Sequence, residues 1–226
     1  NVTPNCIIIV DGIQHSSHGA IDVQKYDIDG YVVSPYKMFS RHGYGVAWAS
    51  ERLCTLNKEQ LADGPFQNWE LGTRDAGSYA TFSDVVDYLD WLGSNFTESE
   101  NTRERLEASS IAIKSHEQEL VDLVINGAED IVGLRNNKKI QIIGTSDSKF
   151  REGVVSFFQK NKPSSIIVEE LRQRKIRVHI RKDDHYCGNI LRPLNQKDCI
   201  RFSICHYNSK AEVVEFMKAI NEISTN

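Results

Sequence analysis

The stretch YVVSPYKMFSRHGYGVAW (residues 31–48) decides the fold that we expect for this chain of 226 residues. It opens on a short apolar run, Tyr31–Val33, of the kind that forms a buried strand. Ser34 and the proline after it mark a turn, and Lys37 lies in that turn. A second apolar run begins at Tyr44. The pattern predicts two strands joined by a turn that carries a lysine.

A further strand is expected upstream of this stretch. The run CIIIV (residues 6–10) is apolar and is followed directly by Asp11. A carboxylate at one strand end and a lysine at a neighbouring strand end suit an enzyme that uses pyridoxal phosphate (PLP). The lysine amine forms a Schiff base with the cofactor, and the carboxylate keeps the pyridine nitrogen protonated. Asp and Lys are common at strand ends, so the spacing alone is weak evidence.

The sequence around these two residues resembles the class V aminotransferase family and, within it, the cysteine desulfurase-like and isopenicillin N epimerase-like enzymes. The matching segments occur in the family's order: DGIQ (11–14), HGAIDV (18–23), SPYK (34–37), ELGT (70–73) and IRFSICHYN (200–208). The resemblance implies an α/β fold, namely the end of a fold-type-I PLP-dependent large domain followed by a smaller α+β C-terminal domain. We expect residues 1–95 to be the truncated C-terminal part of the PLP-binding domain, and residues 96–226 to be a long linking helix and the small domain.

The resemblance also implies roles for individual side chains. Lys37 would be the catalytic Schiff-base lysine, and Asp11 would be the partner of the pyridine nitrogen. Gln14 matches the family residue that hydrogen-bonds the phenolic oxygen of the cofactor. Arg201 would hold the substrate carboxylate, because a guanidinium offers two parallel donors that a lysine cannot reproduce.

Four further residues are implied as contacts of the cofactor phosphate: Ser34, Tyr36, Gly72 and Thr73. The family commonly has a histidine where this chain has Tyr36. A phenol still donates a hydrogen bond, but it carries no positive charge near neutral pH. In the family, the Gly-Thr loop reaches the phosphate of the neighbouring subunit's cofactor. The resemblance therefore implies a homodimer with composite active sites.

Cys187, in the segment HYCG (residues 185–188), is a candidate catalytic nucleophile that forms a persulfide. One group of desulfurases carries its reactive cysteine at a similar distance before the substrate-binding arginine. The alternative is an incidental small residue. Cys199 and Cys205 flank Arg201 in a predicted strand, where packing is the simpler role.

Bulk composition excludes several classes of protein. A net charge of −4 gives no electrostatic reason to expect a nucleic-acid partner. No apolar stretch approaches the roughly 20 residues that a membrane span requires, so we expect no membrane partner. The five cysteines lack zinc-site spacing and suit a reducing, cytoplasmic compartment. The histidines show no metal-ligand spacing, so no metal site is expected.

Periodicity and capping signals predict the remaining elements. Phe82–Leu92 has helical spacing and ends before Gly93, and Thr97 with Glu100 forms a capping box for a long helix over about residues 98–125. Ser209 with Glu212 forms another capping box for a last helix to Ile223. The other predicted elements are a strand pair at 140–144 and 154–158, a helix that starts near Pro163 with Ser164 or Ser165 as its cap and runs to about Arg174, and strands at 176–180 and 199–205.

We expect a PLP-dependent enzyme that acts on an amino acid or a derivative, resembling a cysteine desulfurase or selenocysteine lyase that cleaves a C–S bond through a Schiff base and a carbanion. Epimerisation or other class V chemistry is the alternative within the enzymes. A non-catalytic fragment is a further alternative, because residues 1–50 supply only about three strands and one short helix, Asp22–Tyr26, too few to cover both faces of a parallel sheet. We therefore expect the C-terminal portion of a longer polypeptide that lacks the N-terminal half of the cofactor domain.

Overall fold

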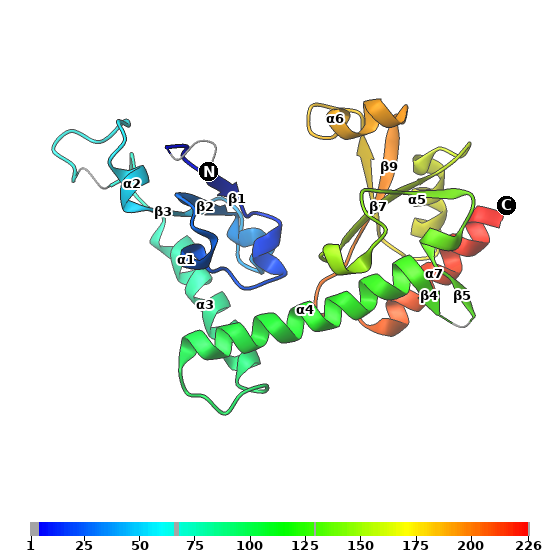
Figure 1. Cartoon of the computed structure of the whole chain (residues 1–226), viewed down its shortest axis with the longest axis horizontal. Helices are drawn as coiled ribbons and strands as arrows, with labels where there is room; N and C mark the ends of the chain where they lie inside the picture. The colour runs from blue at the N-terminus through cyan, green and yellow to red at the C-terminus, as the bar shows by residue number, and fades with distance from the viewer. Residues whose placement is uncertain (1–4, 66–67, 129, 226) are drawn as a thin grey trace. The chain divides into compact units, whose positions relative to one another are not determined.

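The computed structural model describes residues 5–65, 68–128 and 130–225. The chain divides into two compact units, Asn1–Ala112 (unit 1) and Ile113–Asn226 (unit 2), drawn from blue to green and from green to red in Figure 1. The long helix α4 (Thr102–Asn126) contains residues of both units. Within the described ranges, no helix combines the length and the apolar character needed to cross a membrane.

Unit 1 is built on a three-stranded sheet in the order β1-β2-β3. β1 (Ile9–Asp11) is parallel to β2 (Gly30–Val33), and β2 is antiparallel to β3 (Val46–Ala49). These are the three predicted strands, and the short helix α1 (Val23–Tyr26) is confirmed as well. β1 begins later than the apolar run predicted, since the Ile8 N–H donates to the Asp29 carboxylate at 3.0 Å.

The core of unit 1 lies between this sheet and helix α3 (Ala76–Gly93), with Tyr31, Val33, Met38 and Val85 buried together. The predicted helix at 82–92 is therefore confirmed. It starts earlier than expected, because the Asp75 side chain accepts a hydrogen bond from the Ser78 N–H at 3.3 Å and caps the helix. The glycine that ends α3 is required for packing. A Cβ at Gly93 would lie 1.9 Å from the Arg105 carbonyl oxygen of α4.

The predicted capping box at Thr97 and Glu100 is wrong. α4 begins at Thr102, and the Asn101 side chain accepts from the Glu104 N–H at 3.2 Å. Thr97 instead accepts from the Ser99 N–H at 3.2 Å, which closes a turn before the helix. Asparagine and threonine both cap well, so the turn at Thr97 shifts the helix start to the next available cap.

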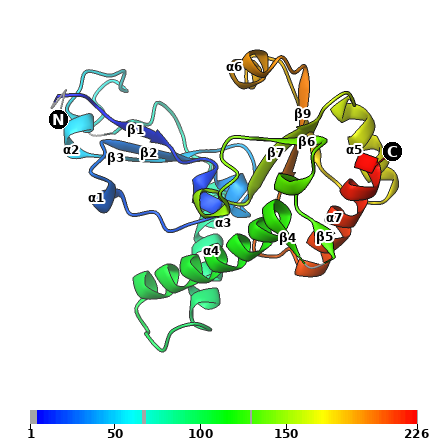
Figure 2. The same cartoon turned by 45° about the vertical axis from the view of Figure 1, so that its right-hand side comes forward.

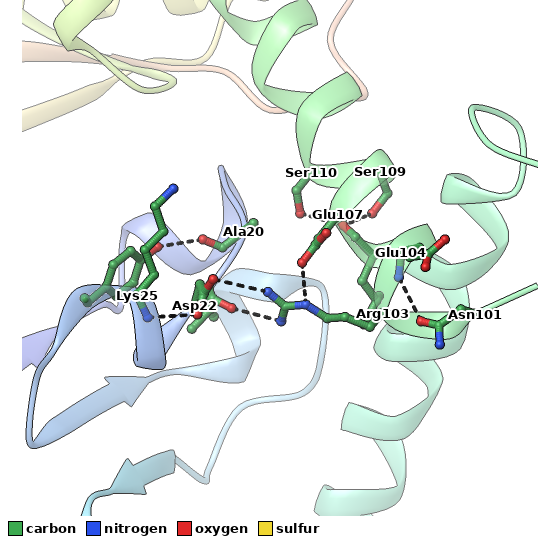
Figure 3. A network of polar contacts seen from close by, with 12 residues as sticks. Ala20, Asp22, Lys25, Asn101, Arg103, Glu104, Glu107, Ser109 and Ser110 are labelled. Atoms are coloured by element: carbon green, nitrogen blue, oxygen red, sulfur yellow. Dashed lines mark hydrogen bonds and ion pairs between the residues drawn. The ribbon is translucent and has the colours of Figure 1, made fainter. Parts of the chain in front are cut away.

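Arg103, in the first turn of α4, holds this helix to the segment before α1. Its Nη1 donates to the Ile21 carbonyl at 3.2 Å, its Nε donates to Glu107 at 2.7 Å, and its Nη2 lies 4.0 Å from Asp22. Figure 3 shows the guanidinium reaching from α4 to Asp22. Asp22 itself caps α1 by accepting from the Lys25 N–H at 3.1 Å. A remaining short helix of unit 1, α2 (Glu51–Cys54), is capped by Ser50.

Unit 2 contains a four-stranded antiparallel sheet in the order β6-β7-β9-β8. Its strands are β6 (Ile140–Ile143), β7 (Val154–Gln159), β8 (His179–Lys182) and β9 (Asp198–Ser203). The predicted pairing of 140–144 with 154–158 is confirmed. β8 starts three residues after the predicted Ile176, because the Ile176 N–H donates to the Leu171 carbonyl at 2.9 Å and continues the end of the preceding helix. A hairpin of β4 (Gly127–Ala128) and β5 (Ile131–Val132) precedes the sheet.

Helices α5 (Ser164–Gln173) and α7 (Lys210–Thr225) share a hydrophobic core with one face of this sheet. Figure 2 shows the two helices beside each other. The capping box of α7 is confirmed: the Glu212 N–H donates to Ser209 Oγ at 3.2 Å, and the Ser209 N–H donates to the Glu212 carboxylate at 2.6 Å. α5 begins directly after Pro163 as predicted, but the predicted serine cap is wrong. Pro163 is the N-cap residue, no side chain caps the helix, and the Ser164 N–H donates to Asp198 at 3.1 Å.

The opposite face of the sheet carries a smaller apolar cluster. Phe158 and Cys199 from the sheet are buried there with Leu191, which belongs to helix α6 (Gly188–Leu191). The remaining short 3-10 helices of unit 2 are η3 (Leu134–Asn136), η4 (Ser148–Phe150) and η5 (Arg192–Leu194). The two faces of the sheet are thus covered unequally, by long helices on one side and by a short segment on the other.

Phe216 of α7 supplies a test of this core. Its ring stacks on Phe202 at 4.3 Å between centroids and is 1% exposed. We expect Phe216→Ala to lower the unfolding free energy of unit 2 by about 3–5 kcal/mol, because a buried aromatic ring leaves a cavity. Hydrogen exchange of β7 and β9 peptides in denaturant measures this loss.

The matched control is Phe150→Ala, since Phe150 is 80% exposed in the same unit. That variant should change the stability by no more than about 0.5 kcal/mol. All three tryptophans, Trp48, Trp69 and Trp91, lie in unit 1, so tryptophan fluorescence monitors that unit separately. Equal losses in the two variants would contradict the assignment of Phe216 to the core.

Candidate functional site

Three of the predicted cofactor residues of unit 1, Asp11, Gln14 and Lys37, lie at one edge of its sheet. β1 and β2 are parallel, so their carboxyl ends lie at the same edge, with Asp11 opposite Val32. Asp11 is the last residue of β1, and Gln14 is the residue before the short helix η1 (His15–Ser17). Lys37 lies in η2 (Pro35–Met38), which follows β2 and lies against η1.

Lys37 is connected to Gln14 at this edge. Lys37 Nζ donates to Gln14 Oε1 at 3.5 Å, a long and therefore weak hydrogen bond. Gln14 Nε2 lies 3.1 Å from His18 Nε2, so the amide is held from both ends. Asp11 Oδ1 accepts from the Ile13 N–H at 3.1 Å, which orients the carboxylate within its turn. The structure thus brings an amine, an amide and a carboxylate to one sheet edge.

Gly12 sets the path of the chain after Asp11. A Cβ at this position would lie 2.1 Å from the Tyr31 ring, which is itself 3% exposed. The Gly12 N–H donates to the Val32 carbonyl at 3.0 Å, so the backbone cannot move away without losing the strand pairing. Any larger residue would displace the turn that carries Asp11 and Gln14.

The predicted phosphate contacts lie in two separate segments of unit 1. Ser34 precedes η2 and does not cap that helix with its side chain, while Tyr36 is 41% exposed within η2. Gly72 and Thr73 lie in an exposed irregular segment between α2 and α3, close in sequence to the ion pair of Glu70 and Arg74. Ser34 and Tyr36 therefore adjoin Lys37 in sequence and structure, and the role of all four residues as phosphate contacts stays a prediction.

In unit 2, Arg201 lies on the sheet face that the long helices leave uncovered. Residues that pair across neighbouring strands share a face, and successive residues alternate. Arg201 pairs with Ser156 and with His179, while its neighbours Ile200 and Phe202 are buried in the helical core. Arg181 pairs with Cys199 on the same face as Arg201.

Cys187 lies at this same face, where its sulfur contacts Arg181. Arg181 Nε donates to Cys187 Sγ at 3.3 Å. This hydrogen bond is the largest cause that raises the pKa of the Arg181 guanidinium. Asp184 Oδ1 accepts from the N–H groups of Tyr186 and Cys187 at 2.9 and 3.0 Å, which shapes the loop. The structure therefore brings Cys187 and Arg201, predicted separately, to one face of one sheet.

This face carries an excess of positive charge. The pKa of His179 is lowered, first by burial and then by the nearby guanidiniums of Arg201, Arg177 and Arg181. The guanidiniums around His179 suit an anionic ligand such as a carboxylate. The sequence interpretation missed Arg181 and His179. Their alternation in HIR (179–181) is a strand signal, but only the register of β8 on β9 connects them to Arg201.

The chain belongs to the class V aminotransferase family, because the family model described as "Aminotransferase class-V" matches residues 2–216. This confirms the family expected from the sequence. The described fold is that of a fold-type-I fragment, with mixed α/β structure that matches about half of two solved cysteine desulfurase chains.

Individual relatives carry desulfurase names. A cysteine desulfurase of Synechococcus elongatus is 28% identical over 237 residues, which cover 96% of this chain and 33% of that protein. The apo structure of a cysteine desulfurase from Thermococcus onnurineus NA1 superposes with a TM-score of 0.73 at 21% identity, covering 97% of this chain and 53% of the other. A mutant of the protein C-DES with glycine covalently linked to its PLP cofactor has a TM-score of 0.66 at 16% identity, covering 94% and 51%. The chain spans about half or less of the length of these relatives.

The sulfur atoms of unit 2 should differ sharply in reactivity. Burial raises the pKa of the Cys199 thiol to about 11, with Cys187 and Asp198 acting in the same direction. Only the thiolate reacts with iodoacetamide, so at about pH 8 we expect Cys187 to be alkylated and Cys199 to be protected. Cys199 should react only as the pH approaches its pKa or when the unit unfolds. Mass spectrometry of the peptides measures both rates.

Arg181→Ala should slow the alkylation of Cys187 several-fold, since the variant loses the N–H that donates to the sulfur. Arg172→Ala is the control, because Arg172 pairs with Glu169 on the exposed side of α5. Alkylation of Cys199 as fast as that of Cys187 in the folded protein would contradict the described packing.

Proposed function

We propose that this chain is the C-terminal part of a PLP-dependent enzyme of the cysteine desulfurase and selenocysteine lyase type, which acts on an amino acid or a derivative. The observation that carries the proposal is the convergence of Lys37, Gln14 and Asp11 at the carboxyl edge of β1 and β2. Residues 1–95 would then be the end of the cofactor domain, and residues 96–226 the linking helix and the small domain.

The side chains at this edge fit the cofactor by their chemistry. Lys37 would supply an amine for the aldehyde carbon, Asp11 a carboxylate for the ring nitrogen, and Gln14 an amide donor for the phenolic oxygen. Ser34 and Tyr36, on the same turn, supply hydroxyl donors for the phosphate. When bound, PLP acts as an electron sink that lowers the barrier to breaking bonds at the substrate Cα. The C-DES structure with a PLP-linked glycine supports this choice of cofactor.

Lys37 has two tasks in this proposal. Its amine holds the cofactor before substrate arrives, and once displaced it moves the proton at Cα. The present contact with Gln14 Oε1 keeps the ammonium or amine at the sheet edge. Asp11, at the end of β1, would offer its carboxylate to the ring nitrogen.

Arg201 and Cys187 define the substrate in this proposal. Arg201 would bind the substrate carboxylate with its planar donor pair. Cys187 Sγ, next to the Arg181 N–H, would accept the sulfur atom of a cysteine-like substrate as a persulfide. Epimerisation and other class V reactions do not require this thiol, so the contact of Arg181 with Cys187 favours sulfur chemistry over them.

The proposal extends to a homodimer with composite active sites. Gly72 and Thr73, on the exposed segment before α3, would reach the phosphate of the partner subunit's cofactor. The open space around the Gly72 Cα, where an added Cβ meets no atom within 4 Å, leaves room for that approach.

Sulfide release tests the proposal. The full-length protein that contains this chain, loaded with PLP, should release sulfide from L-cysteine in the presence of a thiol reductant. Lys37→Ala should abolish release, because the proton at Cα is no longer moved. Cys187→Ala should reduce release by at least about 100-fold, the loss expected for removing a nucleophile.

The control is Cys205→Ala, which removes a thiol elsewhere in unit 2. It should retain most of the wild-type rate. Unchanged sulfide release by Cys187→Ala would overturn the persulfide role, and no reaction of the wild-type protein with any amino acid would overturn the enzymatic proposal itself.

A further inference from the structure

The loop after Lys37 stacks an imidazole on a phenol. The rings of Tyr36 and His42 lie 4.2 Å apart between centroids, with an angle of 19° between their planes. Tyr36 directly precedes Lys37 in η2, so His42 is brought next to the predicted phosphate contacts although it lies beyond them in the sequence. No part of the sequence interpretation assigned a role to this histidine.

The position of His42 is fixed by the fold of its loop. Phe39 has a left-handed backbone (φ 71°), which reverses the chain after η2. The Ser40 N–H then donates to the Pro35 carbonyl at 3.1 Å, so the loop closes back on η2. Ser40 Oγ lies 2.6 Å from the Tyr44 hydroxyl and 2.7 Å from Thr81 Oγ1, which attaches the loop to α3. The stack is therefore held by contacts on both sides of His42.

The other cations of this loop are already engaged. Arg41 lies 3.4 Å from Asp75, the capping residue of α3. Lys37 donates to Gln14 and is the residue proposed to bond the cofactor aldehyde. Tyr36 is a neutral donor. Within residues 34–45, His42 is thus the side chain left to bring positive charge to an anion beside Tyr36 and Ser34.

We infer that His42 is a binding residue for the cofactor phosphate, and that it supplies, from a different position, the charge that Tyr36 cannot carry. The inference rests on the proposed function of this site. A protonated imidazole is favourable over the face of a phenol, and it makes charge-assisted hydrogen bonds to phosphate oxygens. Tyr36 then acts as the platform that orients the imidazole and donates its own O–H.

Comparison of PLP with pyridoxal, which has the same aldehyde and ring but no phosphate, tests this inference. Binding to the full-length apoprotein is measured by the absorbance of the lysine-bound cofactor, and the ratio of the two dissociation constants isolates the phosphate contribution. His42→Gln and His42→Phe should each weaken PLP binding by about tenfold or more, because each removes a charge-assisted hydrogen bond to the phosphate. Pyridoxal binding should change by less than about twofold.

The two substitutions separate charge from stacking. Phenylalanine keeps the ring against Tyr36 but has no N–H and no charge.

His185→Phe is the matched control, since His185 stacks on Tyr186 at 3.9 Å in unit 2. It should leave the ratio unchanged. A wild-type ratio of the two dissociation constants in both His42 variants would overturn the inference. A wild-type ratio in His42→Phe alone would also overturn it, because it would show that a stacked ring without charge is enough for phosphate binding. Failure of the wild-type protein to bind either ligand would instead overturn the proposed function.

Discussion

The parallel pairing of β1 with β2 is the constraint on which the candidate site of unit 1 depends. It places Asp11 opposite Val32, so that the turns carrying Gln14 and Lys37 leave the sheet at the same edge. A shift by one residue would turn every side chain of β1 to the other face. Asp29 opposes such a shift, because its carboxylate accepts from the Ile8 N–H at 3.0 Å and from Ser50 Oγ at 3.1 Å. The hydrogen bond from Ile8 is the largest cause that lowers the pKa of Asp29, and the bond from Ser50 acts in the same direction.

In unit 2, the alternation of side chains along an antiparallel sheet determines which residues lie at the candidate site. The helices of unit 2 bury alternate residues of β9, such as Ile200 and Phe202, and leave Arg201 on the opposite face. Because cross-strand neighbours share a face, the same register places Arg181 on the face of Arg201. Arg181 in turn donates a hydrogen bond to Cys187. The burial of the helical core therefore determines which side chains remain available for a charged ligand.

Much of this architecture was predictable from local sequence. The strands of unit 1, the strand pair β6 and β7, and the capping box of Ser209 and Glu212 all depend on residues near one another in the chain. The capping box at Thr97 and Glu100 failed, although its pattern is equally good, because Asn101 offers a competing cap a few residues later. Capping patterns identify candidate helix starts, and the turn before the helix selects among them.

The relations between distant residues could not be predicted from the pattern. The stack of Tyr36 on His42 requires a left-handed backbone at Phe39, which a bulky residue rarely adopts. The contact of Arg181 with Cys187 requires the register of β8 on β9. Family resemblance supplied the candidate residues, and the structure supplied the neighbours, Arg181, His179 and His42, that give those candidates their chemical surroundings.

The central claim is that Lys37 Nζ is the atom that bonds the cofactor. Incubation of the full-length protein with PLP, reduction with borohydride and mass spectrometry of the peptides measures this bond directly. We expect the phosphopyridoxyl label on the peptide that contains Lys37. A label on a different lysine, or an unlabelled position 37 in protein that has taken up PLP, would contradict it.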